Sequence, residues 1–139
     1  MKKLILTLLL LSPIALPQPA QAGRSEPEPV TCWFFRGETL NLKNTCIYVS
    51  ESWGPGGGRS LTWEDGVTTS MVYGLVGRGT PVCKNTDETS VDGVCGKSYA
   101  RDARTLKRIS DEQRTKLLSQ DSKFIRCIEV KNKSICWLR

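Results

Sequence analysis

The sequence predicts a small, mainly antiparallel β domain, a partly closed sheet or barrel with one short helix near residues 110–120, stapled by disulfide bonds. Three observations lead to this fold class. Short runs of alternating apolar residues are separated by turn-forming dipeptides, only one segment has helix-start signals, and the chain of 139 residues contains six cysteines but no CxxC pair. One domain is expected, because two cores in so short a chain would each be too small to be stable.

The first 22 residues have the three parts of a secretory signal peptide. Lysines at positions 2 and 3 precede an apolar stretch at 4–16, and Ala20-Gln21-Ala22 forms a small-x-small cleavage site. The apolar stretch is too short to cross roughly 30 Å of hydrocarbon, so no membrane span is expected. We therefore expect a secreted or periplasmic protein that is cleaved near Ala22.

The rest of the chain is expected to contain a flexible lead-in at 23–30, which has two prolines and two glutamates, and a single β-rich domain at 31–139. Within the domain, 32–35 and 40–49 are predicted to be the strands of a first hairpin. Residues 52–60 contain four glycines and one proline and are predicted to form a loop.

Two Asp-Gly pairs predict further turns. Strands are expected at 61–63 and 67–75 around Glu64-Asp65-Gly66, because Asp-Gly supplies the positive φ of a tight type I′ turn. Asp92-Gly93 predicts a small hairpin or loop that ends at Cys95.

The last third of the chain is expected to contain the helix and a final hairpin. In 110–120, Ser110 can cap the helix and Gln113 completes a capping box. Strands are predicted at 124–130 and 133–138 around a two-residue turn, a register that places the last two cysteines opposite each other.

All six cysteines follow the expected cleavage site, and an even number in an oxidising compartment predicts disulfides. The gaps within successive couples are short, which predicts sequential pairing: Cys32 with Cys46, Cys83 with Cys95 and Cys127 with Cys136. No metal site is expected, because structural zinc sites normally need closely spaced cysteines or histidines.

Positive charge is concentrated late in the chain. Residues 97–139 carry 12 basic and 5 acidic side chains, whereas 23–96 carry 6 and 9. Two interpretations remain open: a binding face for an acidic polymer, or a solvated surface that pairs with the acidic half. Nucleic acid is not expected, because no nucleic-acid motif accompanies the charge. The candidate face consists of Arg101, Arg104, Lys107, Arg108, Arg114, Lys116, Lys123 and Arg126.

Trp53 lies in the glycine-rich segment, which makes it a candidate for ligand contact or for a lid on the core. The chain has no histidine, which excludes every mechanism that needs an imidazole. No catalytic residue is assigned. The leading expectation is a non-catalytic binding or interaction module, without cofactor, for an acidic polymer or a protein partner. The alternative is a small cofactor-independent hydrolase of an extracellular or cell-wall polymer, acting through carboxylates such as Glu64 and Asp65.

Several short motifs spread over the domain resemble a group of small exported proteins of unknown activity found in cyanobacteria. The motifs are Cys32…Gly37…Leu40…Cys46, then Leu61-Thr-Trp63-Glu-Asp65-Gly66-Val67-Thr68-Thr69, then Val91-Asp92-Gly93, and finally Cys127…Ile135-Cys136-Trp137. The resemblance implies export and a β domain but no particular chemistry. A fainter similarity is to periplasmic lysozyme inhibitors, which are small disulfide-bonded β-barrels, but their Ser-Gly-Ala-Arg-Tyr type of motif is missing here.

Overall fold

The computed structural model describes residues 23–139, so the expected signal segment at 1–22 lies outside the described residues. The predicted fold class is confirmed: strands dominate, they pair antiparallel, and one short helix accompanies them. The strands and the helix are β1 (Glu28–Arg36), β2 (Thr39–Ser52), β3 (Gly56–Thr62), β4 (Thr68–Val76), β5 (Thr80–Pro81), β6 (Glu88–Val91), β7 (Val94–Asp102), β8 (Arg108–Ile109), α1 (Asp111–Ser119), β9 (Phe124–Val130) and β10 (Lys133–Leu138).

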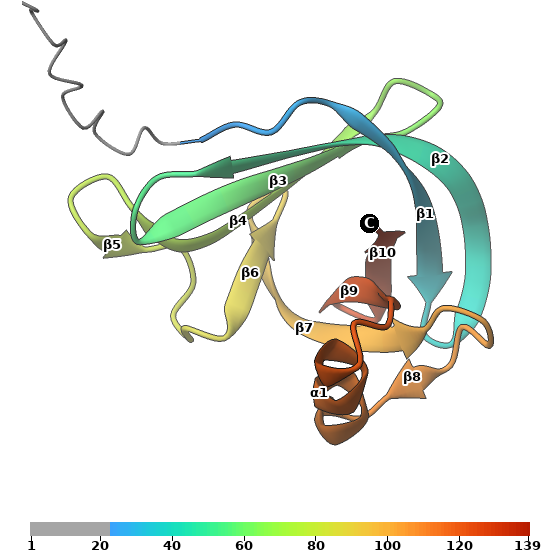
Figure 1. The fold of residues 1–139 in the computed structure, drawn as a ribbon. Coiled ribbons are helices and arrows are strands. Elements are labelled where there is room, and N and C mark those ends of the chain that lie inside the picture. The colour runs from blue at the N-terminus through green and yellow to red at the C-terminus, as the bar shows by residue number, and fades with distance from the viewer. Residues whose placement is uncertain (1–22) are drawn as a thin grey trace, which may run out of the picture.

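The strands are arranged as a ring (Figure 1). Hydrogen-bonded neighbours follow the order β3-β2-β1-β10-β9-β7-β6-β4, and β4 pairs again with β3, which joins the two ends of this path. The short strands β5 and β8 are attached to β4 and β7. The first and last long strands, β1 and β10, are therefore neighbours in the ring, and they pair over six residue pairs.

The first strand begins earlier than residue 31, where ordered structure was expected to start. Strand β1 starts at Glu28, and Val30 is buried in the core. Upstream of it, Arg24 bridges to Glu51, and the Ser25 N–H donates to the Ser50 carbonyl at 2.8 Å. The segment 23–30 is thus attached along β2, because that strand is long enough to pair beyond β1.

The segment 52–60 was predicted to be a loop, but a loop is present only at 53–55, and the prediction is wrong for 56–60. Gly56, Gly57 and Gly58 begin strand β3. All three pair with β4, and Gly57 and Gly58 also pair with β2. Glycine is required there because aromatic rings cover both faces of the strand. A Cβ on Gly56 would lie 2.7 Å from the Trp53 Nε1, and one on Gly57 would lie 2.6 Å from the Tyr73 Cζ. Glycine usually weakens a strand interior, but here it makes room for the two rings.

The turn at Glu64-Asp65-Gly66 also differs from its prediction. Gly66 has a positive φ of 84°, but Asp65 does not, so this is not a type I′ turn. The Gly66 N–H donates to the Trp63 carbonyl and the Trp63 N–H to the Val67 carbonyl, the pattern of a three-residue hairpin loop with a glycine bulge. The pairs Asp92-Gly93 and Lys131-Asn132 do have positive φ at both positions, as a type I′ turn demands.

All three predicted disulfides are present, with Cα–Cα distances of 5.9, 5.9 and 4.1 Å in chain order. The register prediction for the last hairpin is confirmed, since Cys127 lies directly opposite Cys136. The bond between Cys32 and Cys46 lies in the main core cluster, which fills the inside of the ring with side chains from six strands. The bond between Cys127 and Cys136 belongs to a second cluster, on the outer face of β1, β10, β9 and β7.

The predicted helix is confirmed as α1. Ser110 is its N-cap, and the capping box with Gln113 is complete in both directions. No residue of α1 is fully buried, so its stability depends on the caps and on a few contacts with the sheet.

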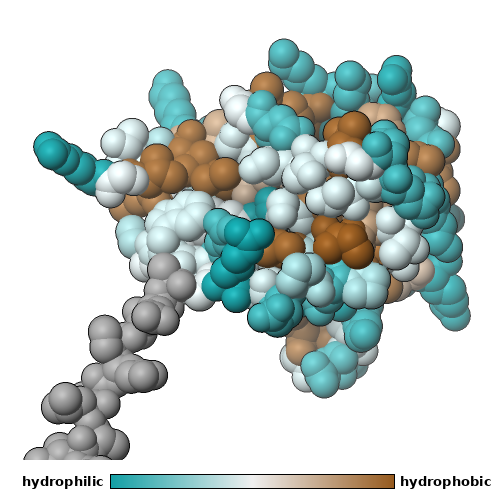
Figure 2. Space-filling view, turned by 90° about the horizontal axis from the view of Figure 1, so that it is seen from above, coloured by the Kyte–Doolittle hydropathy of each residue, from teal (hydrophilic) through white to brown (hydrophobic). Residues whose placement is uncertain are grey.

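No helix of the described part is long and apolar enough to cross a bilayer. Figure 2 shows hydrophobic residues exposed in separate patches between hydrophilic residues on the face seen from above.

Candidate functional site

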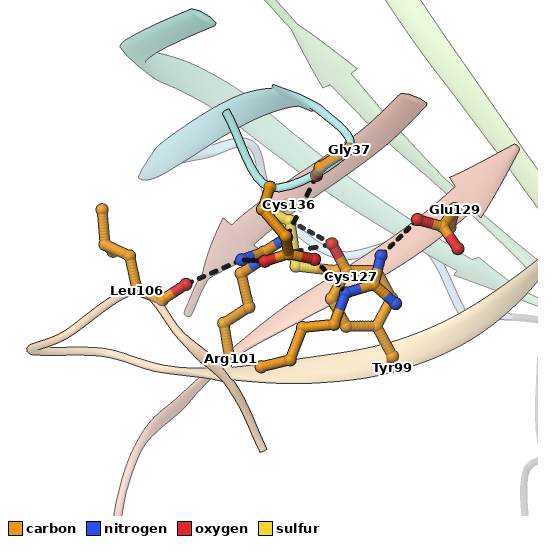
Figure 3. Close-up of a disulfide and its surroundings, with 9 residues drawn as sticks. Gly37, Tyr99, Arg101, Leu106, Cys127, Glu129 and Cys136 are labelled. Carbon is orange, nitrogen blue, oxygen red and sulfur yellow. Dashed lines mark hydrogen bonds and ion pairs between the residues drawn. A yellow bond between two sulfur atoms is a disulfide. The ribbon is translucent and has the colours of Figure 1, made fainter. Parts of the chain in front are cut away.

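Arg101, a member of the predicted basic face, is buried and not available to a ligand. Only 1% of it is exposed, and it lies against Phe35 and Tyr99 of the outer core cluster, near the Cys127–Cys136 disulfide (Figure 3). Its guanidinium lies 4.0 Å from the centroid of the Phe35 ring and donates to the Glu38 Oε2 at 2.9 Å and to the Leu106 carbonyl at 2.8 Å. These contacts favour a structural role over the predicted ligand contact, because the side chain holds the β1–β2 and β7–β8 turns together.

Arg108 has a related structural role. It donates to the Glu38 Oε1 at 2.7 Å and also pairs with Glu129. Burial acts to lower the pKa of Arg108, but its hydrogen bonds to Glu129 and Glu38 outweigh this and raise the pKa. Burial likewise acts to raise the pKa of Glu38, but the hydrogen bonds and charges of Arg101 and Arg108 lower it below the ordinary value of 4.5. The basic half of the sequence thus pairs in part with the acidic half. This pairing was the second of the two interpretations given for the charge distribution.

Four other residues of the predicted basic face are exposed on three different segments. Arg104 and Lys107 are exposed on the turn between β7 and β8, Lys116 is exposed on α1, and Lys123 precedes β9. Hydrogen bonds from the backbone of Thr105 and Arg104 lower the pKa of Asp102, so this carboxylate organises the turn.

Three arginines do meet in one cavity at an end of the ring. Arg59 of β3, Arg114 of α1 and Arg126 of β9 line a hollow of 270 Å³, together with the rings of Phe124 and Trp137. Trp137 lies at the end of β10 that faces this cavity. Two of the three arginines, Arg114 and Arg126, belong to the predicted basic face.

The arginines of this cavity differ from Arg101 and Arg108 in their partners. Within residues 23–139, neither Arg59 nor Arg126 has a carboxylate within salt-bridge distance, and no acidic residue lines the cavity. Arg59 is held instead over aromatic rings, 4.6 Å from the centroid of Tyr73 and 5.9 Å from that of Trp137. Arg126 lies 5.4 Å from the Phe124 centroid. Stacking fixes a guanidinium without using all of its N–H donors, which leaves donors for an anion.

Arg114 adds a further unused donor. It pairs only weakly with Asp111, at 3.4 Å, and its Nε is buried without a hydrogen-bond partner. Buried donors normally have a partner, so this atom is a candidate for contact with a bound group. The cavity can therefore hold one anionic group between planar donors and two aromatic rings.

Sequence reasoning missed Arg59, because the segment 52–60, which contains it, was predicted to be a loop. In strand β3, Gly57, Arg59 and Leu61 alternate with period two and share one face. Leu61 is fully buried inside the ring, which places Arg59 on the inner face as well. Recognition of the glycines as a strand would have located this arginine.

Trp53 lies on the outer face of the sheet. Its Nε1 donates to the Leu75 carbonyl at 2.8 Å, and its ring lies against Gly58. The ring also borders a small hollow of 170 Å³ that includes Glu51 and Ser70. The ring thus covers the outer side of β3 and belongs to neither core cluster, and both predicted roles, ligand contact and a lid on the core, stay predictions.

Glu64 and Asp65, the carboxylates considered for hydrolysis, are exposed at a hairpin tip. The Glu64 Oε1 accepts from the Thr45 N–H at 3.2 Å, and the Asp65 Oδ1 accepts from the Val67 N–H at 2.9 Å. Both groups therefore bond to the backbone of nearby strands and turns.

One group of potential metal ligands, Cys83, Glu88 and Cys95, is found in the described part of the chain. The two sulfurs are bonded to each other, so only the carboxylate could bind an ion. A disulfide does not supply the thiolates that metal ions need.

The Arg59–Arg114–Arg126 cavity is thus the strongest candidate site that the geometry provides. No protein-family model matches this chain, and no similar curated protein or solved structure was found.

Proposed function

We propose that this protein is an exported, non-catalytic binding module whose ligand carries a carboxylate or phosphate group. The observation that carries the proposal is the convergence of Arg59, Arg114 and Arg126 on one cavity that no acidic residue lines. A guanidinium matches a carboxylate or phosphate with two parallel hydrogen bonds, and such charge-assisted bonds are about twice as strong as neutral ones. Export is part of the proposal and is supported by three disulfides, which persist in oxidising compartments.

The shape of the cavity suggests how the ligand is held. At 270 Å³ it accommodates one acidic unit of a longer molecule, such as a sugar acid of a polysaccharide. The rings of Phe124 and Trp137 supply an apolar wall for the carbon skeleton of that unit. We also propose that the chain belongs to the group of small exported proteins that its motifs resemble. Hydrolysis has less support, because the exposed carboxylates of Glu64 and Asp65 bond to backbone groups of nearby strands and turns.

The test is a titration of the disulfide-bonded protein with an oligouronate, a neutral oligosaccharide of equal length and inorganic phosphate. Intrinsic tryptophan fluorescence, to which Trp137 contributes, and calorimetry would report binding. We expect the oligouronate to bind and the neutral sugar not to bind. Arg59→Gln and Arg126→Gln should each weaken binding by roughly tenfold or more, since hydrogen bonds to charged groups contribute about 1.5–3 kcal/mol.

The matched controls are Arg104→Gln and Lys107→Gln, which remove the same charge from the exposed β7–β8 turn. They should leave the affinity nearly unchanged at moderate salt, because exposed charges are screened. Equal losses in the cavity and control variants would contradict the proposal and indicate diffuse attraction. Absence of binding to both the oligouronate and inorganic phosphate would also contradict it.

A further inference from the structure

The end of the ring away from the arginine cavity has two adjoining apolar hollows. Their volumes are 680 and 240 Å³, and the side chains of Phe34 and Ile135 line both. Around them Leu42, Val67 and Val94 are 43%, 59% and 41% exposed. We call this surface the open end of the ring. Contiguous exposed apolar side chains of this kind mark interaction sites on folded proteins.

The open end has opposite charges at its two sides. The larger hollow is bordered by Glu64 and Asp65, the acidic rim, and the smaller one by Lys131 and Lys133, the basic rim. Asp92 also borders the smaller hollow, where its Oδ1 accepts from the Ser70 N–H at 2.8 Å, so that side keeps a net positive charge. The apolar strip between the rims is centred on the residues that both hollows share.

This arrangement is complementary to itself. A two-fold axis through the shared residues would bring Phe34 and Ile135 of two copies together. The same rotation carries each side of the strip to the other side, so the acidic rim of one copy would face the basic rim of the other. Isologous interfaces in homodimers have this property. A different protein would need its own matching charge pattern, whereas a second copy of this chain carries it already.

We propose that the open end is the interface of a homodimer, in which the apolar strips pack together and the acidic and basic rims pair across a two-fold axis. The arginine cavity of each copy remains accessible in this dimer, because β10 extends from Lys133 at the open end to Trp137 at the cavity. The dimer would present two anion sites on opposite sides. Two linked sites bind a long acidic chain more tightly than one site does.

The test is sedimentation velocity of the disulfide-bonded protein over a range of concentrations. The unmodified protein should sediment as a dimer. Two double variants change the charges of the rims and leave the apolar side chains of the strip in place: Glu64→Lys with Asp65→Lys makes both rims basic, and Lys131→Glu with Lys133→Glu makes both rims acidic. Each variant alone should weaken the dimer by roughly tenfold or more, because like charges would face each other.

An equimolar mixture of the two variants should restore the dimer, since a basic-rim copy then faces an acidic-rim copy. Restoration also shows that both variants are folded, which their melting curves would check separately. A monomeric unmodified protein, unchanged dimerisation of the variants, or a mixture that stays monomeric would each overturn the proposal. None of these outcomes depends on ligand binding at the arginine cavity, so the two proposals fail independently.

Discussion

Replacement of Arg101 by alanine tests whether this buried arginine is structural. The side chain is 1% exposed and makes one charge-assisted bond to Glu38, one bond to the Leu106 carbonyl and a cation–π contact with Phe35. Loss of one partner of a buried pair costs about 3–5 kcal/mol. Because the Glu38 side chain is 64% exposed and can be hydrated after the change, we take the lower end, about 3 kcal/mol.

For a domain of this size, about 3 kcal/mol corresponds to a decrease in Tm of roughly 12 °C. Thermal denaturation followed by circular dichroism measures it, and guanidinium titration checks the free energy of unfolding. Arg104→Ala on the neighbouring exposed turn is the matched control and should shift Tm by only about 2 °C. Equal small shifts for Arg101→Ala and the control would refute the structural role and return Arg101 to the candidate binding face.

Three further predictions follow from side chains outside the arginine cavity lining. Arginine partners lower the pKa of Glu38, so its ionised form stabilises the fold fully above pH 4.5. This stabilisation is lost as the pH falls through the lowered pKa. Glu38→Gln should therefore reduce Tm above pH 4.5 but not in stronger acid. Gly57→Ala should destabilise by about 1–3 kcal/mol, because the new Cβ would meet the Tyr73 ring. Trp53→Ala should cost about 2 kcal/mol in chemical denaturation, because the half-buried ring loses its packing and its bond to the Leu75 carbonyl.

Each of these has a clear contrary result. A Tm difference for Glu38→Gln that persists far below pH 4.5 would mean that packing, and not charge, is the cause. An unchanged unfolding curve for Gly57→Ala would mean that Tyr73 moves freely. Unchanged stability of Trp53→Ala would favour ligand contact over the lid.

Much of the architecture follows from local sequence signals. The capping box of Ser110 and Gln113 predicts α1, and the two-residue turn before Lys133 places Cys127 opposite Cys136. These features depend on residues within a few positions of each other, where backbone geometry and capping chemistry decide the outcome. The sequential disulfides also belong to this group, because each closes a short loop.

Other features depend on contacts between distant segments, and only the tertiary structure decides them. The glycines at 56–58 form a strand because Trp53 and Tyr73 cover them, and the second ring comes from the neighbouring strand β4. Charge alone groups Arg101 with Arg126, although one is buried against Phe35 and the other lines a cavity. The folded sheet and helix bring Arg59, Arg114 and Arg126 to one cavity, whereas Arg101 and Arg108 pair with Glu38 outside it.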